Sequence, residues 1–150
     1  MTIRISVQRD PRGAGPPRGA LLRWVRAALA GRRREAEVVL RIVDAAEGAT
    51  LNATWRGKQN PTNVLSFPIG DPPSAVPDLL GDLVLCAPVV SEEARTQGKE
   101  EEAHWAHLVI HGTLHLLGFD HQRIRDARVM ESLERDILSR LGYPDPYEAH

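Results

Sequence analysis

The chain has 150 residues, of which 42% are hydrophobic and 26% charged, and its formal net charge is −1. This composition is typical of one globular domain with a sizeable core. A single cysteine excludes an internal disulfide. The first ten residues lack a signal-peptide core, and no apolar run approaches the roughly 20 residues that a membrane-spanning helix needs, so we expect a cytoplasmic protein with no membrane partner.

The charge is unevenly distributed along the chain. Residues 1–58 hold 12 basic and 5 acidic side chains, whereas residues 59–150 hold 7 and 15. A basic half raises the chance of a polyanionic partner. The run of Arg32, Arg33 and Arg34, taken alone, is explained more simply by the solvation of a turn.

Strands predominate in the first part of the chain. Residues 2–7 alternate apolar and polar side chains, which predicts a strand. Residues 20–31 predict a helix that ends at a glycine. The expected core stripe of this helix consists of Leu21, Leu22, Val25, Ala28 and Leu29. Three more strands are expected at 36–44, 64–68 and 79–87, with a short helix at 45–56 and Pro-rich loops at 10–19 and 69–78.

From Pro88 onward the pattern is helical. Helices are expected at 89–98, 100–118 and 123–142, each ending at a glycine. No repeat or domain linker interrupts the chain, so we expect a single domain over residues 1–150. Because strands come early and helices late, the predicted class is α+β or mixed α/β. The expected core positions of the last helix are Ile124, Val129, Met130, Leu133, Ile137 and Leu141.

Residues 111–121, H-G-T-L-H-L-L-G-F-D-H, carry three histidines in an apolar segment. His111 and His115 are four residues apart, so their rings are neighbours on one helix face, at a spacing that suits one tetrahedral ion. Gly118 can turn the chain back after the helix and bring His121 to the same ion. Three protein ligands leave one coordination position open, as in catalytic zinc sites. The sequence therefore predicts a metal site, with zinc as the default ion.

Alternatives remain open in this helix. His107 and His111 are also four residues apart and would make a second ligand pair, but only the first set uses the turn at Gly118. His104 and His107 are therefore expected at the surface or on a cleft wall. Any one of these rings taken singly is explained as well by ordinary hydrogen bonds. Asp120 either orients a ligand imidazole or caps the turn.

Gly112 occupies the position at which an H-E-x-x-H protease carries the glutamate that acts as general base. A metal can lower the pKa of a bound water without a neighbouring carboxylate, but peptide hydrolysis by the usual route is then disfavoured. A substrate that brings its own negative charge, such as a phosphodiester, would instead require a cation nearby.

Three segments resemble the YbeY family, bacterial rRNA maturation factors described as metal-dependent endoribonucleases. Residues 111–121 resemble the family's H-G-x-L-H-L-x-G-Y-D-H signature. Residues 51–68, L-N-A-T-W-R-G-K-Q-N-P-T-N-V-L-S-F-P, resemble its L-N-x-x-Y-R-x-K-D-x-P-T-D-V-L-S-F-P, and residues 79–86 resemble its L-L-G-D-I-V-I-S. Met130 and Glu134 also fit the family's C-terminal helix. The resemblance spans nearly the whole chain from about residue 35.

The resemblance implies one Zn²⁺ ion per chain at His111, His115 and His121, with Arg56 at the cleft and with Arg56 and His111 as catalytic residues. It implies action on ribosomal RNA precursors, especially 3′-end maturation of the small-subunit RNA, and a role in ribosome quality control. The implied partners are ribosomal RNA, the small ribosomal subunit, and ribosomal proteins or an assembly GTPase. The implied fold is α+β, a small mixed sheet of about four strands packed with about five helices, distantly similar to zinc proteases.

Several residues depart from the family pattern. Asn60 and Asn63 stand where the family commonly has Asp, and Phe119 replaces a tyrosine. If the carboxylate at position 63 holds Arg56 or a loop in the family, that contact is weaker here. The three histidines are intact, so the departures concern the catalytic details more than metal binding.

Two other functions compete with an endoribonuclease. A zinc hydrolase of a peptide would share the metal site but would need a general base from elsewhere, with Glu101, Glu102 or Asp82 as candidates. A ribosome-assembly binding factor would use the zinc mainly for structure. An open coordination position favours chemistry over the structural role.

Overall fold

The computed structural model describes residues 2–9, 15–44, 46–47, 64–68, 79–119 and 124–147. Each strand and helix predicted within these ranges is confirmed to within about two residues at its ends. The short helix expected at 45–56 lies mostly outside the described residues. The elements are β1 (Thr2–Gln8), α1 (Arg18–Leu29), β2 (Glu35–Val43), β3 (Val64–Pro68), β4 (Leu79–Cys86), α3 (Ala87–Gln97), α4 (Glu101–Leu116) and α5 (Ile124–Leu141).

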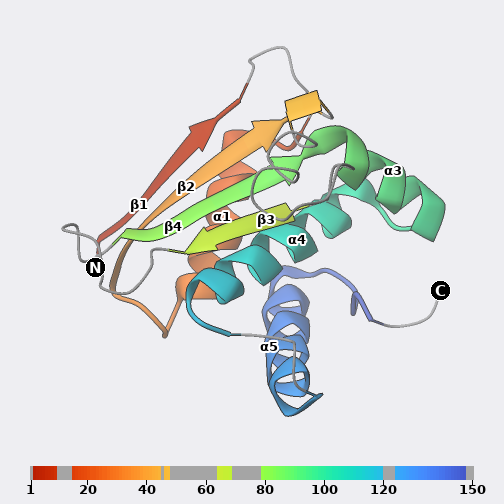
Figure 1. Cartoon of the computed structure of the whole chain (residues 1–150). Coiled ribbons are helices and arrows are strands. Elements are labelled where there is room, and N and C mark those ends of the chain that lie inside the picture. The colour runs from red at the N-terminus through yellow and green to blue at the C-terminus, as the bar shows by residue number, and fades with distance from the viewer. Residues whose placement is uncertain are drawn as a thin grey trace.

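The strands form one mixed sheet in the order β1-β2-β4-β3 (Figure 1). The first three run parallel, and β3 pairs antiparallel with β4. The small mixed sheet of four strands is therefore confirmed. A helical crossover through α1 joins the parallel strands β1 and β2, which makes the class mixed α/β. The described residues contain four helices, whereas about five were expected for the whole chain.

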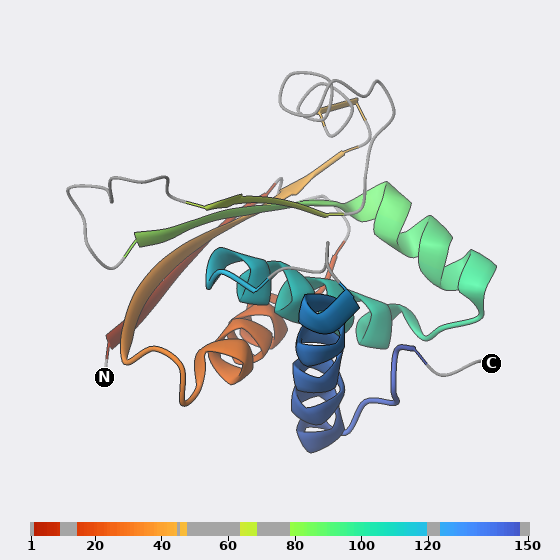
Figure 2. The same cartoon turned by 60° about the horizontal axis from the view of Figure 1, so that its bottom comes forward.

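Helices α1, α4 and α5 lie on one side of the sheet, and α3 continues from the end of β4 beyond the end of the sheet (Figure 2). Helices α1 and α4 lie along that face, and α5 packs on α4 and extends away from the sheet. The core between these layers contains the fully buried rings of Trp24 and Trp105 and aliphatic side chains from the strands, α1 and α4. Within the described residues, none of the helices is both long enough and apolar enough to cross a bilayer.

The helix cores differ from expectation at several positions. In α1, Trp24 is fully buried while Leu22 is only half-buried. In α5, Ile124 and Val129 were expected in the core but are 76% and 50% exposed. The physical reason is that Ile124 and Val129 lie on the two flanks of the buried stripe, each roughly 100° or more from its centre at about 100° per residue. The buried members of the stripe are Met130, Glu134, Ile137 and Leu138, so a carboxylate shares it with apolar side chains.

Candidate metal centre

Helix α4 lies directly against the sheet because Gly112 has no side chain. A Cβ at this position would lie 2.7 Å from Cδ2 of Leu83 on β4 and 3.3 Å from Cγ2 of Val64 on β3. The Ser66 hydroxyl of β3 donates to the Gly112 carbonyl oxygen at 3.3 Å. Position 112 therefore faces β3 and β4, and the histidines on either side of it occupy another face of the helix.

The end of α4 has the sharp turn that the sequence predicts. Gly118 adopts φ +103°, in the region that favours glycine. Its N–H donates to the His115 carbonyl at 2.9 Å, and the Phe119 N–H donates to the Leu114 carbonyl at 3.1 Å, which together form a Schellman motif. The chain thus turns back immediately after the second histidine of the predicted site.

The histidines form a row along α4. The ring centroids of His111 and His115 are 4.8 Å apart and those of His107 and His111 are 6.0 Å apart. The predicted adjacency of the His111 and His115 rings is confirmed. His121, Arg56 and Asp120 lie outside the described residues, so the third ligand, the cationic residue and the turn carboxylate stay predictions.

A buried carboxylate on α5 joins this row. The side chain of Glu134 is 0% exposed, and its Oε1 accepts a hydrogen bond from Nδ1 of His111 at 2.5 Å. Nε2 of His107 lies 3.3 Å from the same oxygen. The second oxygen, Oε2, accepts from the hydroxyl of Tyr147 at 2.5 Å. Both carboxylate oxygens are therefore engaged, and Nδ1 of His111 must carry its proton because a carboxylate only accepts.

The same contacts shift the pKa values of the acidic groups. Burial by itself would raise the pKa of Glu134, but hydrogen bonds from His107, His111 and Tyr147 and the charge of His111 outweigh burial and lower it from 4.5 to about 2. Burial and the bond to Glu134 raise the pKa of Tyr147 above its usual range. Glu134 is therefore ionised near neutral pH, and the Tyr147 hydroxyl keeps its proton and donates it.

Two arrangements of metal ligands have to be compared: His107, His111 and Glu134, or the predicted set that contains His111 and His115. His107, His111 and Glu134 offer ligand atoms that all lie within 4.8 Å of one another. However, two ligands of one tetrahedral zinc ion, each about 2.0–2.1 Å from the metal, are roughly 3.3 Å apart. The 2.5 Å between Oε1 of Glu134 and Nδ1 of His111 is a hydrogen bond rather than such a spacing. With Nδ1 bound to Glu134, a metal on this ring would take Nε2, and Glu134 would orient the ligand from the opposite side of the ring.

His104, the first histidine of the row, was expected at the surface or on a cleft wall, but it is buried. His104 is 4% exposed, and its Nε2 is 3.0 Å from Oε1 of Glu93 on α3. Burial lowers the pKa of His104, against the opposing effect of Glu93. His107 is half-buried, as expected for a cleft wall, and it contacts Glu134 and Tyr147. The physical reason for the burial of His104 is that α3 packs over the first turns of α4.

Replacing Glu134 with alanine is expected to lower the free energy of unfolding by about 3 kcal/mol near neutral pH, because it removes the buried carboxylate that accepts hydrogen bonds from His111 and Tyr147. The folded pKa of about 2 lies below the unfolded value of 4.5, so the stabilisation by Glu134 is fully present above pH 4.5 and is lost as the pH falls toward 2. Urea unfolding at pH 7 and pH 3 measures this difference between wild type and variant.

The matched control for this prediction is Asp136→Ala, which removes an exposed carboxylate of α5 that pairs with Arg140 at 3.0 Å. We expect it to change stability by less than about 0.5 kcal/mol. A Glu134→Ala variant as stable as Asp136→Ala at pH 7 would contradict the assigned role of Glu134.

Glu134 and Tyr147 were not predicted as site residues. Glu134 had a usable signal, since it sits four residues after Met130 and four before Leu138, in the middle of an apolar stripe, where a charge needs a partner. Tyr147 had none, because it follows P-D-P after the last helix and belongs to no periodic pattern.

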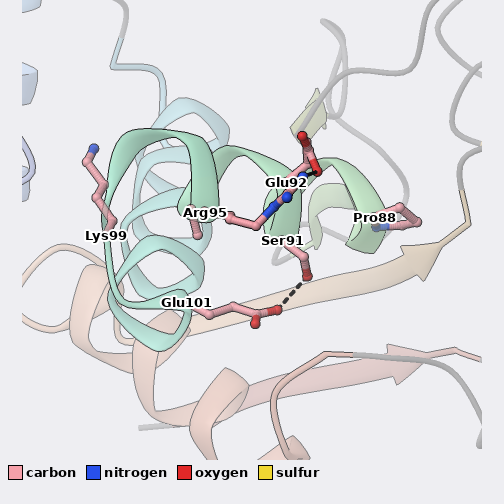
Figure 3. A pocket seen from close by; sticks show the side chains of 7 residues that line it. Pro88, Ser91, Glu92, Arg95, Lys99 and Glu101 are labelled. Carbon is pink, nitrogen blue, oxygen red and sulfur yellow. Dashed lines mark hydrogen bonds and ion pairs between the residues drawn. The ribbon is translucent and has the colours of Figure 1, made fainter.

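Two pockets lie elsewhere on the molecule. One of about 370 Å³ between α3 and the start of α4 is lined by charged groups that pair with each other (Figure 3). In it, Ser91 donates to Glu101 at 2.5 Å and Arg95 pairs with Glu92. The other, of about 690 Å³, is lined by Gly31, Arg32, Arg33, Arg34 and Glu35. Arg32 also donates to the Ala28 and Ala30 carbonyls at the end of α1, in keeping with a role in the turn.

Comparison of the chain with family models and with curated proteins identifies the same family. A family model described as "Endoribonuclease YbeY" matches residues 19–142. A curated protein of that name from Nitrosococcus oceani is 51% identical over 99% of this chain and 99% of its own, and one from Pseudomonas entomophila is 54% identical over 97% and 93%. A solution structure of TM1509 from Thermotoga maritima superposes with a TM-score of 0.61 at 24% identity, covering 98% of this chain and 99% of that one. At that identity the likeness concerns the fold alone.

Proposed function

The chain belongs to the YbeY family of endoribonucleases, and from this premise we propose that it is a metal-dependent enzyme that cleaves single-stranded RNA. We assign it to the processing of ribosomal RNA, at the 3′ end of the small-subunit RNA, and to ribosome quality control in the cytoplasm. The observation that carries the proposal is the pair of rings at His111 and His115, 4.8 Å apart, with a buried carboxylate behind the first.

We assign one Zn²⁺ ion per chain to His111, His115 and His121. The donor set fits this ion because neutral imidazoles at helical spacing, one of them hydrogen-bonded through Nδ1 to a carboxylate, are characteristic zinc ligands. A bound zinc ion supplies Lewis acidity, which lowers the pKa of water and polarises a phosphoryl oxygen. In this scheme Glu134 fixes the tautomer and the orientation of His111, so that Nε2 faces the ion.

The substrate class follows from what surrounds the histidines. Gly112 places no carboxylate beside them, and a larger residue there would meet Leu83 and Val64. Without that base, a phosphodiester is a better substrate than a peptide, since charge on its transition state is stabilised by a metal and by Arg or Lys. Arg56 is our candidate for the cation that clamps the phosphate, with ribosomal RNA of the small subunit as the partner.

Replacing Arg56 with alanine is expected to lower the rate of RNA cleavage by about 10²–10³-fold, since the variant loses a donor to the charge that develops on the phosphate. Zinc content is expected to stay at the wild-type level because Arg56 is not a ligand. Cleavage of a single-stranded RNA oligonucleotide and elemental analysis of the same preparations measure the two effects. Arg56→Lys should recover only part of the rate because it lacks the bidentate guanidinium.

Arg140→Ala serves as the control, because it removes one positive charge from an exposed arginine that pairs with Asp136. It should cleave at the wild-type rate. An Arg56→Ala variant that also cleaves normally would refute the role given to Arg56 while leaving the metal site standing.

The same assay separates the competing functions. A wild-type protein that binds zinc and cleaves RNA in a chelator-sensitive manner supports the enzyme. Chelator-sensitive cleavage of an unstructured protein, with RNA left intact, would support a peptide hydrolase instead. Binding to the small ribosomal subunit by a zinc-loaded protein that cleaves neither would support an assembly factor.

A further inference from the structure

The residues that follow α5 are fixed against three parts of the fold. We call residues 143–147 the C-terminal clasp. Figure 2 shows it turning back after α5 toward the end of α4 that follows α3. The Tyr143 oxygen accepts from Nε1 of Trp24 at 3.2 Å, and the Pro146 carbonyl accepts from Nζ of Lys99 at 3.2 Å. The match to the family model ends at residue 142, before the clasp begins.

Further contacts hold the last described residue in place. Asp145 pairs with Arg135 on α5 at 3.1 Å and accepts from the backbone N–H of Tyr147 at 2.8 Å. The guanidinium of Arg135 also lies over the ring of Tyr147, with 5.2 Å from Cζ to the centroid. These contacts aim the Tyr147 hydroxyl inward, where it donates to Oε2 of Glu134 at 2.5 Å.

We propose that Tyr147 is a positioning residue for the metal centre, which acts on His111 through Glu134 and extends the functional site to this one residue of the C-terminal clasp. The proposal rests on the proposed function, because it takes His111 as a metal ligand. It assigns a role to Tyr147, which lies 32 residues after His115 in the sequence and contacts the site through its hydroxyl group and, at His107, through its ring.

The physical reason is that a fully buried carboxylate needs donors at both oxygens. Oε1 of Glu134 accepts from His111, and Oε2 accepts from Tyr147. If the hydroxyl is removed, Oε2 is left buried without its donor, and the carboxylate gains by rotating toward another partner. His107 is such a partner, since its Nε2 already lies 3.3 Å from Oε1 and can take a larger share of the carboxylate. Rotation would weaken the bond that holds the His111 ring in the orientation suited to a metal.

A merely structural role for Tyr147 makes a different prediction. In that case the hydroxyl helps to hold the clasp on the fold, and its loss lowers stability without changing metal affinity. Tyr143→Phe is the matched control, since it removes the other tyrosine hydroxyl of the clasp. The described hydrogen-bond partners of that hydroxyl are Trp24 and Arg23 on α1.

The experiment measures the zinc dissociation constant of the full-length wild type, Tyr147→Phe, Tyr143→Phe and Glu134→Gln by competition with a chromophoric chelator. We expect Glu134→Gln to weaken zinc binding by about 10–100-fold. Tyr147→Phe should weaken it by about 5-fold, because Tyr147 contacts Glu134 and not the ligand His111 itself. Tyr143→Phe should bind zinc within 2-fold of wild type. The proton on Nδ1 of His111, followed by ¹H–¹⁵N NMR, should exchange faster in Glu134→Gln and in Tyr147→Phe, and at the wild-type rate in Tyr143→Phe.

Wild-type zinc affinity and an unchanged Nδ1–H signal in Tyr147→Phe would overturn the inference while leaving the proposed function intact. Equal weakening in Tyr147→Phe and Tyr143→Phe would also overturn it, in favour of a general effect of the clasp on stability. A wild-type protein that binds no zinc would overturn the proposed function itself, so the two failures are distinguishable.

Discussion

Replacing His115 with alanine is expected to abolish zinc binding and to lower the rate of RNA cleavage by about 10³-fold or more, while the chain stays folded. The loss follows because the ion would lose one of its three proposed ligands and with it several kcal/mol of transition-state stabilisation. Of the proposed ligands, His115 is the best one to replace, because its half-buried ring lies at the end of the row. His111→Ala would also strip a partner from the buried Glu134 and so lower stability.

His107→Ala is the informative companion to this variant, because it separates the two metal arrangements. If His111, His115 and His121 hold the ion, His107→Ala should still bind zinc, with an affinity within about tenfold of wild type, because His107 would lie next to the ligands without being one. If the ion lies among His107, His111 and Glu134, His107→Ala loses it and His115→Ala retains it. Zinc content, cleavage rate and circular dichroism of both variants decide between them.

Replacing Gly112 with glutamate, which recreates the H-E-x-x-H pattern, is expected to destabilise the chain by about 4 kcal/mol or more and to yield little folded protein. The Cβ alone would lie 2.7 Å from Leu83, which is 0% exposed, and 3.3 Å from Val64. The carboxylate would then be buried between α4 and the sheet, where the described residues offer it no cation. Gly112→Ala should lower stability by only about 1–2 kcal/mol, because the overpacking is partly offset by the better helix propensity of alanine.

Gly19→Glu is the control for this substitution. Gly19 lies in the first turn of α1 with no atom within 4 Å of an added Cβ, and an acidic side chain there is favourable at a helix N-terminus. Urea unfolding of the three variants should rank Gly19→Glu at or above wild type and Gly112→Glu last. A Gly112→Glu variant that unfolds like wild type would contradict the close packing of α4 on β3 and β4.

The elements were predictable because local signals mark them clearly. Alternation marks β1, and a glycine follows α1, α3, α4 and α5, with positive φ at Gly31, Gly98, Gly118 and Gly142. The strand order β1-β2-β4-β3 was not predictable from these signals, since it depends on which strands pair at long range. The core of α5 was assigned wrongly at Ile124 and Val129, because the predicted stripe was wider than the one that α5 buries, and Glu134 was not expected within that stripe.

The candidate site was likewise predictable only where its residues are close in the sequence. The i, i+4 spacing of His111 and His115 sufficed to place their rings side by side, because both lie on one helix. The bond between His111 and Glu134 joins residues 23 apart in sequence, and it depends on how α5 packs on α4. Tyr147 depends in addition on the path of the clasp, which the contacts of Asp145 and Pro146 determine. The roles of Arg56 and His121 stay predictions.

The most direct measurement is the metal content of the purified full-length chain together with its RNA cleavage before chelation, after chelation and after zinc is restored. We expect about one zinc ion per chain, loss of cleavage when the ion is removed, and recovery when it is returned. A metal-free chain that cleaves single-stranded RNA at the full rate would contradict a catalytic metal bound by the histidines of α4.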